Sequence, residues 1–301
     1  MAPHAGLNVL YGSNGAGKTS ILESIVVLSR GRSFRTTQAA ELIGPAGKSF
    51  RVFAETLGRH NKTSKIGLER SLRHWRARKD GEDILQLSKL TRGLPLVLME
   101  PNSHLLVSGS PETRRRFLDW GMFHVEHEFL QVWRRFSKIL KQRNAALRTG
   151  GEEVLESIDV VFAEVGEKLG SLRGVHTREI SGRVQKLLEE LSSGLGPVTI
   201  EYKEGWKKGS LLESLQRNRE KDLAKGVTGT GPHRSDISLV YQGAAARAVL
   251  SRGEQKILAA ALLLSQADIL TAQDRVPVLL LDDLASEFDE LHYKSVLNRA
   301  M

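Results

Sequence analysis

The sequence feature that most constrains the fold is a glycine-rich string close to the start, Gly12-Ser13-Asn14-Gly15-Ala16-Gly17-Lys18-Thr19. It matches G-x-x-x-x-G-K-[ST], the pattern of a phosphate-binding loop that joins a strand to a helix. The apolar run Leu7 to Tyr11 predicts the strand, and apolar residues at helical spacing in Ser20 to Leu28 predict the helix. The string therefore predicts an α/β fold with an anion at the positive N-terminus of that helix. A glycine-rich turn that binds nothing is the alternative.

Each residue type in this string has its own task. The glycines let successive backbone N–H groups turn inward around phosphates, Lys18 reaches the terminal phosphates, and the Thr19 hydroxyl faces a magnesium ion. The residues expected to bind the nucleotide are Gly12, Ser13, Asn14, Gly15, Ala16, Gly17, Lys18, Thr19 and Ser20.

The composition bounds the class of protein. With 301 residues, 40% of them hydrophobic, the chain can bury one large core or two smaller ones. It has no cysteine, which excludes disulfides and thiolate metal sites, and its start does not resemble a secretory signal. The longest apolar run, Ile257 to Leu264, is far shorter than the roughly 20 residues that cross a bilayer. We therefore expect a cytoplasmic protein without a membrane span.

The net charge of +9 is concentrated in clusters. Residues 59–79 carry eight basic side chains against one acid, and residues 129–148 carry six and no acid. Such clusters attract nucleic-acid phosphates regardless of base sequence, although a charge run can also be a solvated face. The DNA-binding candidates are Arg70, Arg73, Arg76, Lys79, Arg134, Arg135, Lys138 and Lys141. The triplet Arg114 to Arg116 either contacts phosphates or pairs with acids of neighbouring helices.

The apolar periodicity changes twice along the chain and predicts an ATPase lobe interrupted by a helical insertion. Residues 1–105 form the first part of the lobe, with a strand at Ser49 to Leu57 and an apolar segment at Leu94 to Met99. Residues 106–195 have helical spacing, but glycines at 166, 170, 174 and 182 interrupt it and predict a compact lobe rather than a long, straight coiled coil. Residues 196–301 form the second part, where Val198 to Tyr202 is expected to be a strand that returns to the sheet.

A second motif begins a helix near residue 250. The string is Leu250-Ser251-Arg252-Gly253-Glu254-Gln255-Lys256, and an apolar, alanine-rich helix follows it. Ser251 as N-cap and Glu254 three residues later form a capping box, which explains these two residues. Capping explains neither Gly253 nor Gln255.

The same string resembles the signature loop of ATP-binding-cassette ATPases, with Arg252 and Glu254 in place of the usual residues. In that class the serine and backbone amides of the loop complete the γ-phosphate site of a partner subunit. The resemblance therefore implies a site formed in trans by Ser251, Arg252, Gly253, Glu254 and Gln255.

A third motif is the apolar run Val276 to Leu281, followed by Asp282 and Asp283. The run predicts a central parallel strand buried on both faces, with its carboxylates at the edge where open α/β sheets bind ligands. There one carboxylate can hold Mg²⁺ and the next can polarise the attacking water. The likeness to cassette ATPases assigns the metal to Asp282, together with Thr19, and catalysis to Asp283. It also places Asp289 at a dimer contact. The alternative for Asp282 and Asp283 is an acidic turn at the end of a strand.

Further strings make the resemblance more specific. They are Gly-Arg-Ser-Phe-Arg (31–35), Arg-Arg-Phe-Leu-Asp-Trp-Gly (115–121), Leu-Lys-Gln-Arg-Asn-Ala-Ala-Leu-Arg (140–148), Gly-Pro-His-Arg-Ser-Asp (231–236) and Leu-Ser-Arg-Gly (250–253). With the phosphate loop they resemble the RecF family of bacterial recombinational repair ATPases, relatives of the SMC head domains, over almost the whole chain. This implies an α/β fold of the P-loop ABC/SMC-type ATPase head, a mixed sheet with flanking helices, carrying a helical inserted arm domain.

The resemblance also implies a function. The protein would bind ATP with Mg²⁺, form an ATP-dependent homodimer, and contact single-stranded or gapped duplex DNA through its backbone. With RecO and RecR partners it would help to load recombinase on DNA. It would do so in the cytoplasm, associated with the nucleoid, as part of the SOS response. The implied activity is a weak DNA-dependent ATPase that acts mainly as an ATP-switched DNA-binding protein. A role of His233 near the nucleotide is also implied, against the simpler interpretation of a turn residue.

Two other functions stay open at this point. A transporter-type ATPase with a membrane partner would share the nucleotide motifs, but the long separation of Gly12 from Ser251 and the basic clusters do not favour it. The other is a DNA-binding scaffold that does not hydrolyse ATP. It stays open because RecF proteins have strands before the phosphate loop and a histidine-bearing strand after the second carboxylate, and neither is evident in this sequence. We accordingly expect a chain truncated at both ends, with unpaired sheet edges.

Overall fold

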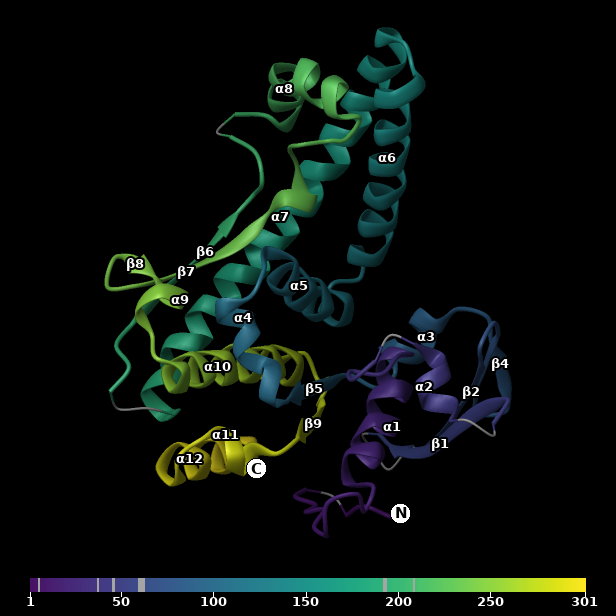
Figure 1. The fold of residues 1–301 in the computed structure, drawn as a ribbon, viewed down its shortest axis with the longest axis vertical. Helices are drawn as coiled ribbons and strands as arrows, with labels where there is room; N and C mark the ends of the chain where they lie inside the picture. The colour runs from purple at the N-terminus through teal and green to yellow at the C-terminus, as the bar shows by residue number, and fades with distance from the viewer. Residues whose placement is uncertain (5, 37, 45–46, 59–62, 192–193, 208) are drawn as a thin grey trace. The chain divides into compact units, whose positions relative to one another are not determined.

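The computed structural model describes the whole chain except residues 5, 37, 45–46, 59–62, 192–193 and 208. The chain divides into two compact units (Figure 1). Unit 1 comprises residues 1–100, 275–283 and 300–301, and unit 2 comprises residues 101–274 and 284–299. None of the helices in the described part of the chain is long and apolar enough to span a bilayer.

Unit 1 combines short helices with two groups of strands. Its elements are α1 (Lys18–Arg30), α2 (Ala39–Ile43), β1 (Ser49–Leu57), β2 (Thr63–Ser71), β3 (Trp75–Lys79), β4 (Glu82–Ile84), α3 (Leu87–Arg92), β5 (Leu96–Met99) and β9 (Val278–Leu281). The strand predicted for β1 has the observed bounds, and the helix predicted after the phosphate loop is present as α1. Strands β1 to β4 form an antiparallel sheet in chain order.

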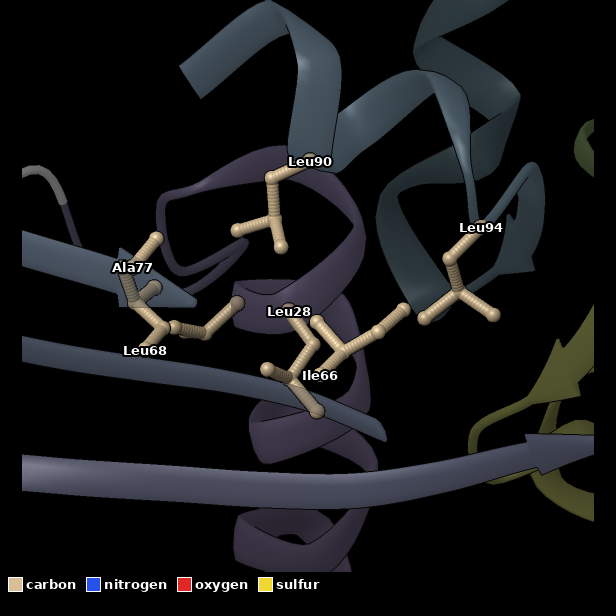
Figure 2. Packing of buried hydrophobic residues seen from close by; sticks show 7 residues of the cluster. Leu28, Ile66, Leu68, Ala77, Leu90 and Leu94 are labelled. Atoms are coloured by element: carbon tan, nitrogen blue, oxygen red, sulfur yellow. The ribbon is translucent and has the colours of Figure 1, made fainter. Parts of the chain in front are cut away.

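One face of this sheet forms a core with helices of the same unit. Figure 2 shows Leu28 of α1 and Leu90 of α3 beside the sheet residues Ile66, Leu68 and Ala77. All five side chains are at most 3% exposed. The alternation of the strands therefore presents one apolar face, which α1 and α3 cover.

The second group of strands is the parallel pair β5 and β9, with Met99 opposite Leu281. Leu22, Ile25 and Val26 of α1 pack against apolar side chains of this pair. The last turn of α1 is hydrogen-bonded to the chain that enters β5, because the Ser29 hydroxyl donates to the Leu94 carbonyl at 2.7 Å. Helix α1 therefore runs against the direction of β5, and its first turn points toward the edge where both strands end.

Two strand predictions for unit 1 are wrong. The run Leu7 to Tyr11 is not a strand, and Leu7, Val9 and Tyr11 are 52%, 70% and 91% exposed. A strand gains stability only from a neighbour, and no described strand pairs with this run. Likewise β9 is not buried on both faces: Val278 is 36% exposed, since β5 is the one described strand beside it.

Unit 2 is mainly helical and holds a small sheet. Its elements are η2 (Pro101–His104), α4 (Leu105–Ser108), α5 (Pro111–Val125), α6 (Phe129–Thr149), α7 (Glu152–Leu191), β6 (Val198–Lys203), α8 (Leu211–Lys225), η3 (Pro232–Arg234), β7 (Asp236–Tyr241), β8 (Ala244–Ala245), α9 (Ala246–Val249), α10 (Arg252–Ala272), α11 (Leu284–Glu287) and α12 (Glu290–Ala300), whose last residue belongs to unit 1. Figure 1 shows α6 lying along one half of the much longer α7.

Helix α7 is continuous over 40 residues, so the expected interruption by glycines is wrong. Two of these glycines allow other elements to approach the helix backbone closely. A Cβ built at Gly166 would lie 2.5 Å from Leu211 Cδ2, and one at Gly170 would lie 2.7 Å from the Trp206 ring. Each glycine costs about 1 kcal/mol of helix stability, and this packing offsets the cost.

We predict opposite effects of two glycine-to-alanine substitutions in helices of unit 2. Gly182→Ala places a Cβ in open space and restricts the unfolded chain, so it should stabilise by about 0.5–1 kcal/mol. In Gly121→Ala the Cβ would lie 2.1 Å from Gln266 Oε1 and 2.5 Å from His176 Nε2, and these two atoms are hydrogen-bonded to each other. That variant should lose about 1–3 kcal/mol. Urea unfolding measures both, and midpoints that shift in the same direction would contradict the prediction.

The small sheet of unit 2 has the antiparallel order β6-β7-β8. The strand predicted at Val198 to Tyr202 is present as β6, but it pairs with β7 rather than with β5 or β9. The expectation that it returns to the ATPase sheet is therefore wrong. The inward side chains of β6, Val198 and Ile200, are buried, and the Gln185 side chain of α7 forms hydrogen bonds with the Val198 backbone. Packing on α7 thus holds β6 in unit 2.

A buried charge cluster joins α6, α7 and α8. Arg143 is 0% exposed; its Nε donates to Asp159 Oδ1 at 2.7 Å and its Nη1 to Asp222 Oδ2 at 2.7 Å. The same Nη1 donates to the Thr228 hydroxyl at 3.0 Å, and Arg219 reaches Asp159 at 3.3 Å. One cation thus compensates carboxylates from two other helices, and removing it would leave buried charges without a partner.

The arginine triplet of α5 is engaged inside unit 2. Arg114 pairs with Asp236 at 2.7 Å and is buried, and Arg115 donates to the Ser235 carbonyl at 2.6 Å. Arg116 pairs with Glu112 on its own helix. Of the two interpretations of the triplet, internal pairing is the one that the structure shows. The strings 115–121 and 231–236 are therefore in contact with each other.

Candidate nucleotide-binding site

The phosphate loop has the backbone that an anion site needs. Gly12, Gly15 and Gly17 have φ of 152°, 83° and 87°, a region that residues with a Cβ adopt at a cost. Gly17 is the N-cap of α1, and the first bond within the helix runs from the Ile21 N–H to the Gly17 carbonyl at 3.1 Å. The N–H groups of the three residues between them therefore have no acceptor within the helix. They point out of the helix N-terminus, where they attract an anion.

The Lys18 side chain folds back over the loop. Its Nζ donates to the carbonyl oxygens of Gly12 at 2.9 Å and Ser13 at 3.0 Å. The ammonium group thus lies beside the free N–H groups of the first turn and adds a full positive charge to them. Phosphate oxygens can replace the two carbonyl acceptors, because the contacts are exposed and a charged oxygen is a stronger acceptor for an ammonium group than a neutral carbonyl.

Two carboxylates meet at the edge toward which α1 points. The Asp282 N–H donates to the Met99 carbonyl at 2.9 Å, so Asp282 after β9 lies beside Glu100 after β5. Burial raises the pKa of Asp282, and the charge of Asp283 adds to this, while Arg35 opposes it. Burial also raises the pKa of Glu100, with a contribution from Asp282. The edge therefore carries negative charge that a cation would stabilise.

Glu100 is a residue that sequence reasoning missed at this site. The signal was present, because an acid directly ends the apolar run Leu94 to Met99. The second acid of the predicted pair, Asp283, takes a left-handed backbone conformation with φ 54°. This conformation turns the chain sharply after β9, immediately before α11.

The second motif forms the start of α10. Ser251 is its N-cap, and both bonds of the predicted capping box are present: the Glu254 N–H to the Ser251 hydroxyl, and the Ser251 N–H to the Glu254 carboxylate. Gln255 is buried and its Nε2 donates to the Leu250 carbonyl at 2.9 Å, which explains this residue within the chain. A Cβ at Gly253 would meet nothing within 4 Å, so no described contact requires glycine there.

Asp289 precedes α12 and interacts with His292 on it. The Asp289 Oδ1 accepts the His292 N–H at 3.0 Å, and Oδ2 lies 2.6 Å from His292 Nδ1. Both hydrogen bonds lower the pKa of Asp289, and the one from the His292 backbone has the larger effect. The carboxylate is exposed and acts as a helix cap in this unit; a dimer contact stays a prediction.

The two clusters of DNA-binding candidates differ in how their charges are used. In the β2–β3 hairpin, Arg70 donates a hydrogen bond to the Gly31 carbonyl at 2.8 Å. Arg76 and Arg78 both form ion pairs with Asp83, at 3.3 and 2.7 Å. Arg59 and Lys62 lie outside the described residues.

On α6 the candidate side chains are exposed. Arg135 pairs with Glu164 at 3.3 Å. Lys138 and Lys141 have no ion-pair or hydrogen-bond partner among the residues that the structure describes. In the hairpin, the side chains of Arg73 and Lys79 likewise have no ion-pair or hydrogen-bond partner among the described residues, so both clusters keep uncompensated charge.

His233 belongs to the core of unit 2. Its ring lies near those of Phe136 and Phe162, with centroids 6.3 and 6.4 Å away, and its Nε2 contacts the Thr228 carbonyl at 2.9 Å. Burial lowers its pKa to about 4. These contacts place the ring in the core of unit 2, where its Nδ1 is buried without a hydrogen-bond partner among the described residues.

We predict that His233 makes unit 2 less stable in acid. Because the pKa is lowered to about 4 in the folded state, the unfolded chain takes up the proton first as pH falls below about 6.5. Stability should fall between about pH 6.5 and 4, by up to about 1.4 kcal/mol per pH unit from this group. His233→Gln keeps a donor for Thr228 and should show a shallower slope in urea unfolding over that range. An unchanged slope would contradict the assignment.

The phosphate loop on α1, the parallel strands ending in carboxylates and the capped α10 together define a P-loop ATPase head of the SMC type. The family described as RecF/RecN/SMC N terminal domain matches residues 1–300. The DNA replication and repair protein RecF of Stenotrophomonas maltophilia (strain R551-3) is 43% identical over 309 residues, which cover 100% of this chain and 85% of that protein. The chain therefore belongs to the RecF family.

Solved structures agree with the fold. A structure of the recombination mediator protein RecF-ATP in the RecFOR pathway has a TM-score of 0.87 and 27% identity, and covers 96% of this chain and 82% of that one. The Smc head domain from Pyrococcus furiosus, bound to the C-terminal domain of ScpA, has a TM-score of 0.51 at 16% identity, covering 96% of this chain and 78% of that one; it shares the fold. The predicted fold class, an ABC/SMC-type ATPase head with flanking helices, is confirmed.

Proposed function

We propose that this chain is an ATP-switched DNA-binding protein of recombinational DNA repair and replication-fork maintenance, with a weak ATPase activity. The observation that carries the proposal is the phosphate loop, where the Lys18 ammonium lies over glycines with positive φ at the open N-terminus of α1. The RecF relative named a DNA replication and repair protein, and the solved RecF-ATP structure, support it.

The residues at this loop fit ATP and Mg²⁺. A Cβ built at Gly15 or Gly17 would meet nothing within 4 Å, so the loop leaves space beside its N–H groups. Thr19 and Asp282 would hold Mg²⁺ through hydroxyl and carboxylate oxygens, the ligand type that this ion prefers. The raised pKa of Asp282 fits this role, because a cation would offset the burial of this carboxylate, its main cause, and the repulsion from Asp283. The bound ion would supply neutralisation of phosphate charge.

A second copy of the chain would complete the site. Ser251, Arg252 and Gly253 are exposed at the start of α10, and Gly253 leaves its surface open for an approaching phosphate. Glu254 and Gln255 would hold this loop in shape through the capping box and the bond to Leu250. Asp289, also exposed, would lie at the contact between subunits. ATP would thus join two copies, and hydrolysis would release them.

We predict that Asp283→Asn keeps ATP binding and ATP-promoted dimerisation but slows hydrolysis at least about a hundredfold, since an amide cannot accept a proton from water. Light scattering and phosphate release are measured on the same sample with ATP and Mg²⁺. Glu82→Gln, an exposed acid of β4, serves as the control and should match the parent. Hydrolysis at the parental rate in Asp283→Asn would contradict its catalytic role, and no ATP-dependent rise in mass in either protein would contradict the dimer.

The partners follow from the same proposal. We infer that the protein acts at gapped or single-stranded DNA in the cytoplasm, associated with the nucleoid, and helps to load recombinase with RecR and RecO mediators. The RecFOR pathway in which the similar RecF-ATP structure was described supports this set of partners.

A further inference from the structure

The exposed positive charge of unit 2 includes a row of basic residues on α6 and another on α8. We define the basic band as Lys138, Lys141, Arg148, Arg217, Lys221 and Lys225. All six side chains are exposed, and none has an ion-pair or hydrogen-bond partner within the part of the chain that the structure describes. Their charges are therefore available to an outside partner.

Each helix carries its part of the band on one face. In α6, at 3.6 residues per turn, Lys138, Lys141 and Arg148 lie opposite the buried side of the helix, which includes Phe136 and Arg143. In α8 the three basic residues are spaced four apart, so they also lie on one side. Both rows are thus fixed by helices that pack into the core of unit 2.

The two rows meet at the C-terminal ends of the helices. A Cβ built at Gly226, the left-handed C-cap of α8, would lie 3.0 Å from the Arg148 Cγ. Lys225 directly precedes this glycine, so the last cation of α6 and the last of α8 are neighbours. Figure 1 shows α8 beside the end of the α6–α7 pair at which α6 finishes.

The chemistry of the band favours a duplex backbone over a single strand. Proteins that hold single strands stack bases on exposed aromatic rings. In α6 the rings of Phe129 and Phe136 are buried, and Trp133 is 40% exposed but held by a hydrogen bond to Asp119; α8 has no aromatic residue. Rows of cations on rigid helices, with Trp133 as their one exposed ring, are suited to the regular phosphates of a duplex, one charge per about 1.7 Å of axis.

We propose that the basic band binds the phosphate backbone of duplex DNA. The inference rests on the proposed function. It selects α6 and α8 because their six cations without a described partner outnumber those of the β2–β3 hairpin, where Arg73 and Lys79 have none and Arg76 and Arg78 share Asp83. The band recognises charge and shape, so it carries no preference for base sequence.

The test compares the full chain with the triple variant Lys138→Ala, Lys141→Ala, Arg148→Ala. Fluorescence anisotropy is measured with labelled duplex and single-stranded oligonucleotides, with ATP and Mg²⁺, over a range of salt concentrations. Each lost phosphate contact lowers the slope of log affinity against log salt by roughly 0.9, so three should lower it by roughly 2.7. Duplex affinity at about 0.1 M salt should fall at least about tenfold.

The matched control is Arg178→Ala, Lys186→Ala, Lys207→Ala, which removes the same charge from exposed side chains elsewhere in unit 2. It should keep the parental duplex affinity. A second variant, Lys138→Arg with Lys141→Arg, keeps the charge and should also bind normally. If the triple variant unfolds in a thermal scan, the single variant Lys141→Ala decides, with an expected loss of slope of roughly 0.9.

The outcomes separate this inference from the proposed function. Parental duplex affinity and slope in the triple variant would overturn the band while leaving ATP-dependent DNA binding intact. Loss of single-strand binding alone, or loss of binding to anionic phospholipid vesicles with unchanged duplex affinity, would show that the band serves another partner. A parent protein that binds neither form of DNA would overturn both.

Discussion

Replacing Lys18 by alanine is expected to weaken ATP binding at least about a hundredfold, because a charge-assisted bond to phosphate contributes about 1.5–3 kcal/mol and this side chain offers more than one. In the protein the Lys18 Nζ already donates to Gly12 and Ser13 at 2.9 and 3.0 Å, directly over the loop. The alanine variant keeps the glycine backbone and the open helix N-terminus. It therefore removes the point charge and leaves the rest of the phosphate loop.

Titration of a fluorescent ATP analogue measures this change. Lys89→Ala is the control, since it removes an exposed lysine from the same unit and should bind ATP as the parent does. Thermal unfolding without nucleotide should hardly differ among the three proteins, because both carbonyl contacts of Lys18 are exposed. Equal ATP affinity in Lys18→Ala and the parent would refute the assignment of this loop.

The second large effect concerns stability. Arg143→Ala is expected to destabilise unit 2 by about 3–5 kcal/mol, the usual cost of leaving a buried charge without its partner. Asp159 and Asp222 are 0% and 1% exposed, and both lose the guanidinium group at 2.7 Å. Arg219 still reaches Asp159, so Asp222 is the carboxylate left with the larger deficit.

Urea unfolding followed by circular dichroism tests this prediction. Arg135→Ala on the same helix breaks an exposed pair with Glu164 and should cost at most about 1 kcal/mol. A triple variant, Arg143→Met with Asp159→Asn and Asp222→Asn, should lose less than Arg143→Ala, because no unpaired charge is left in the core. If Arg143→Ala and Arg135→Ala unfold at the same urea concentration, the buried cluster does not hold unit 2 together.

The motifs near the site could be predicted because local chemistry decides them. Within the phosphate loop the glycines act on their immediate neighbours, and the N-cap Ser251 and its capping partner Glu254 are three residues apart. The structure has the expected local geometry at both motifs. The strand Ser49–Leu57 was also predictable, since its alternation matches a sheet with one covered face.

What the sequence did not reveal depends on distant neighbours. The continuity of α7 rests on Leu211 and Trp206, which pack onto Gly166 and Gly170 from far along the chain. The run Leu7 to Tyr11 has the composition of a strand but no described strand beside it. Glu100 joins the acidic edge only because β5 and β9 are paired, a contact between residues 182 positions apart (Met99 and Leu281).

The most direct test of an ATP-switched DNA-binding protein is the affinity of this chain for labelled gapped duplex DNA, measured by anisotropy with and without ATP and Mg²⁺ over a range of salt concentrations. We expect tighter binding with ATP, and an affinity that falls steeply as salt increases. Folded protein that binds DNA equally well with and without ATP, or does not bind it, would contradict the account.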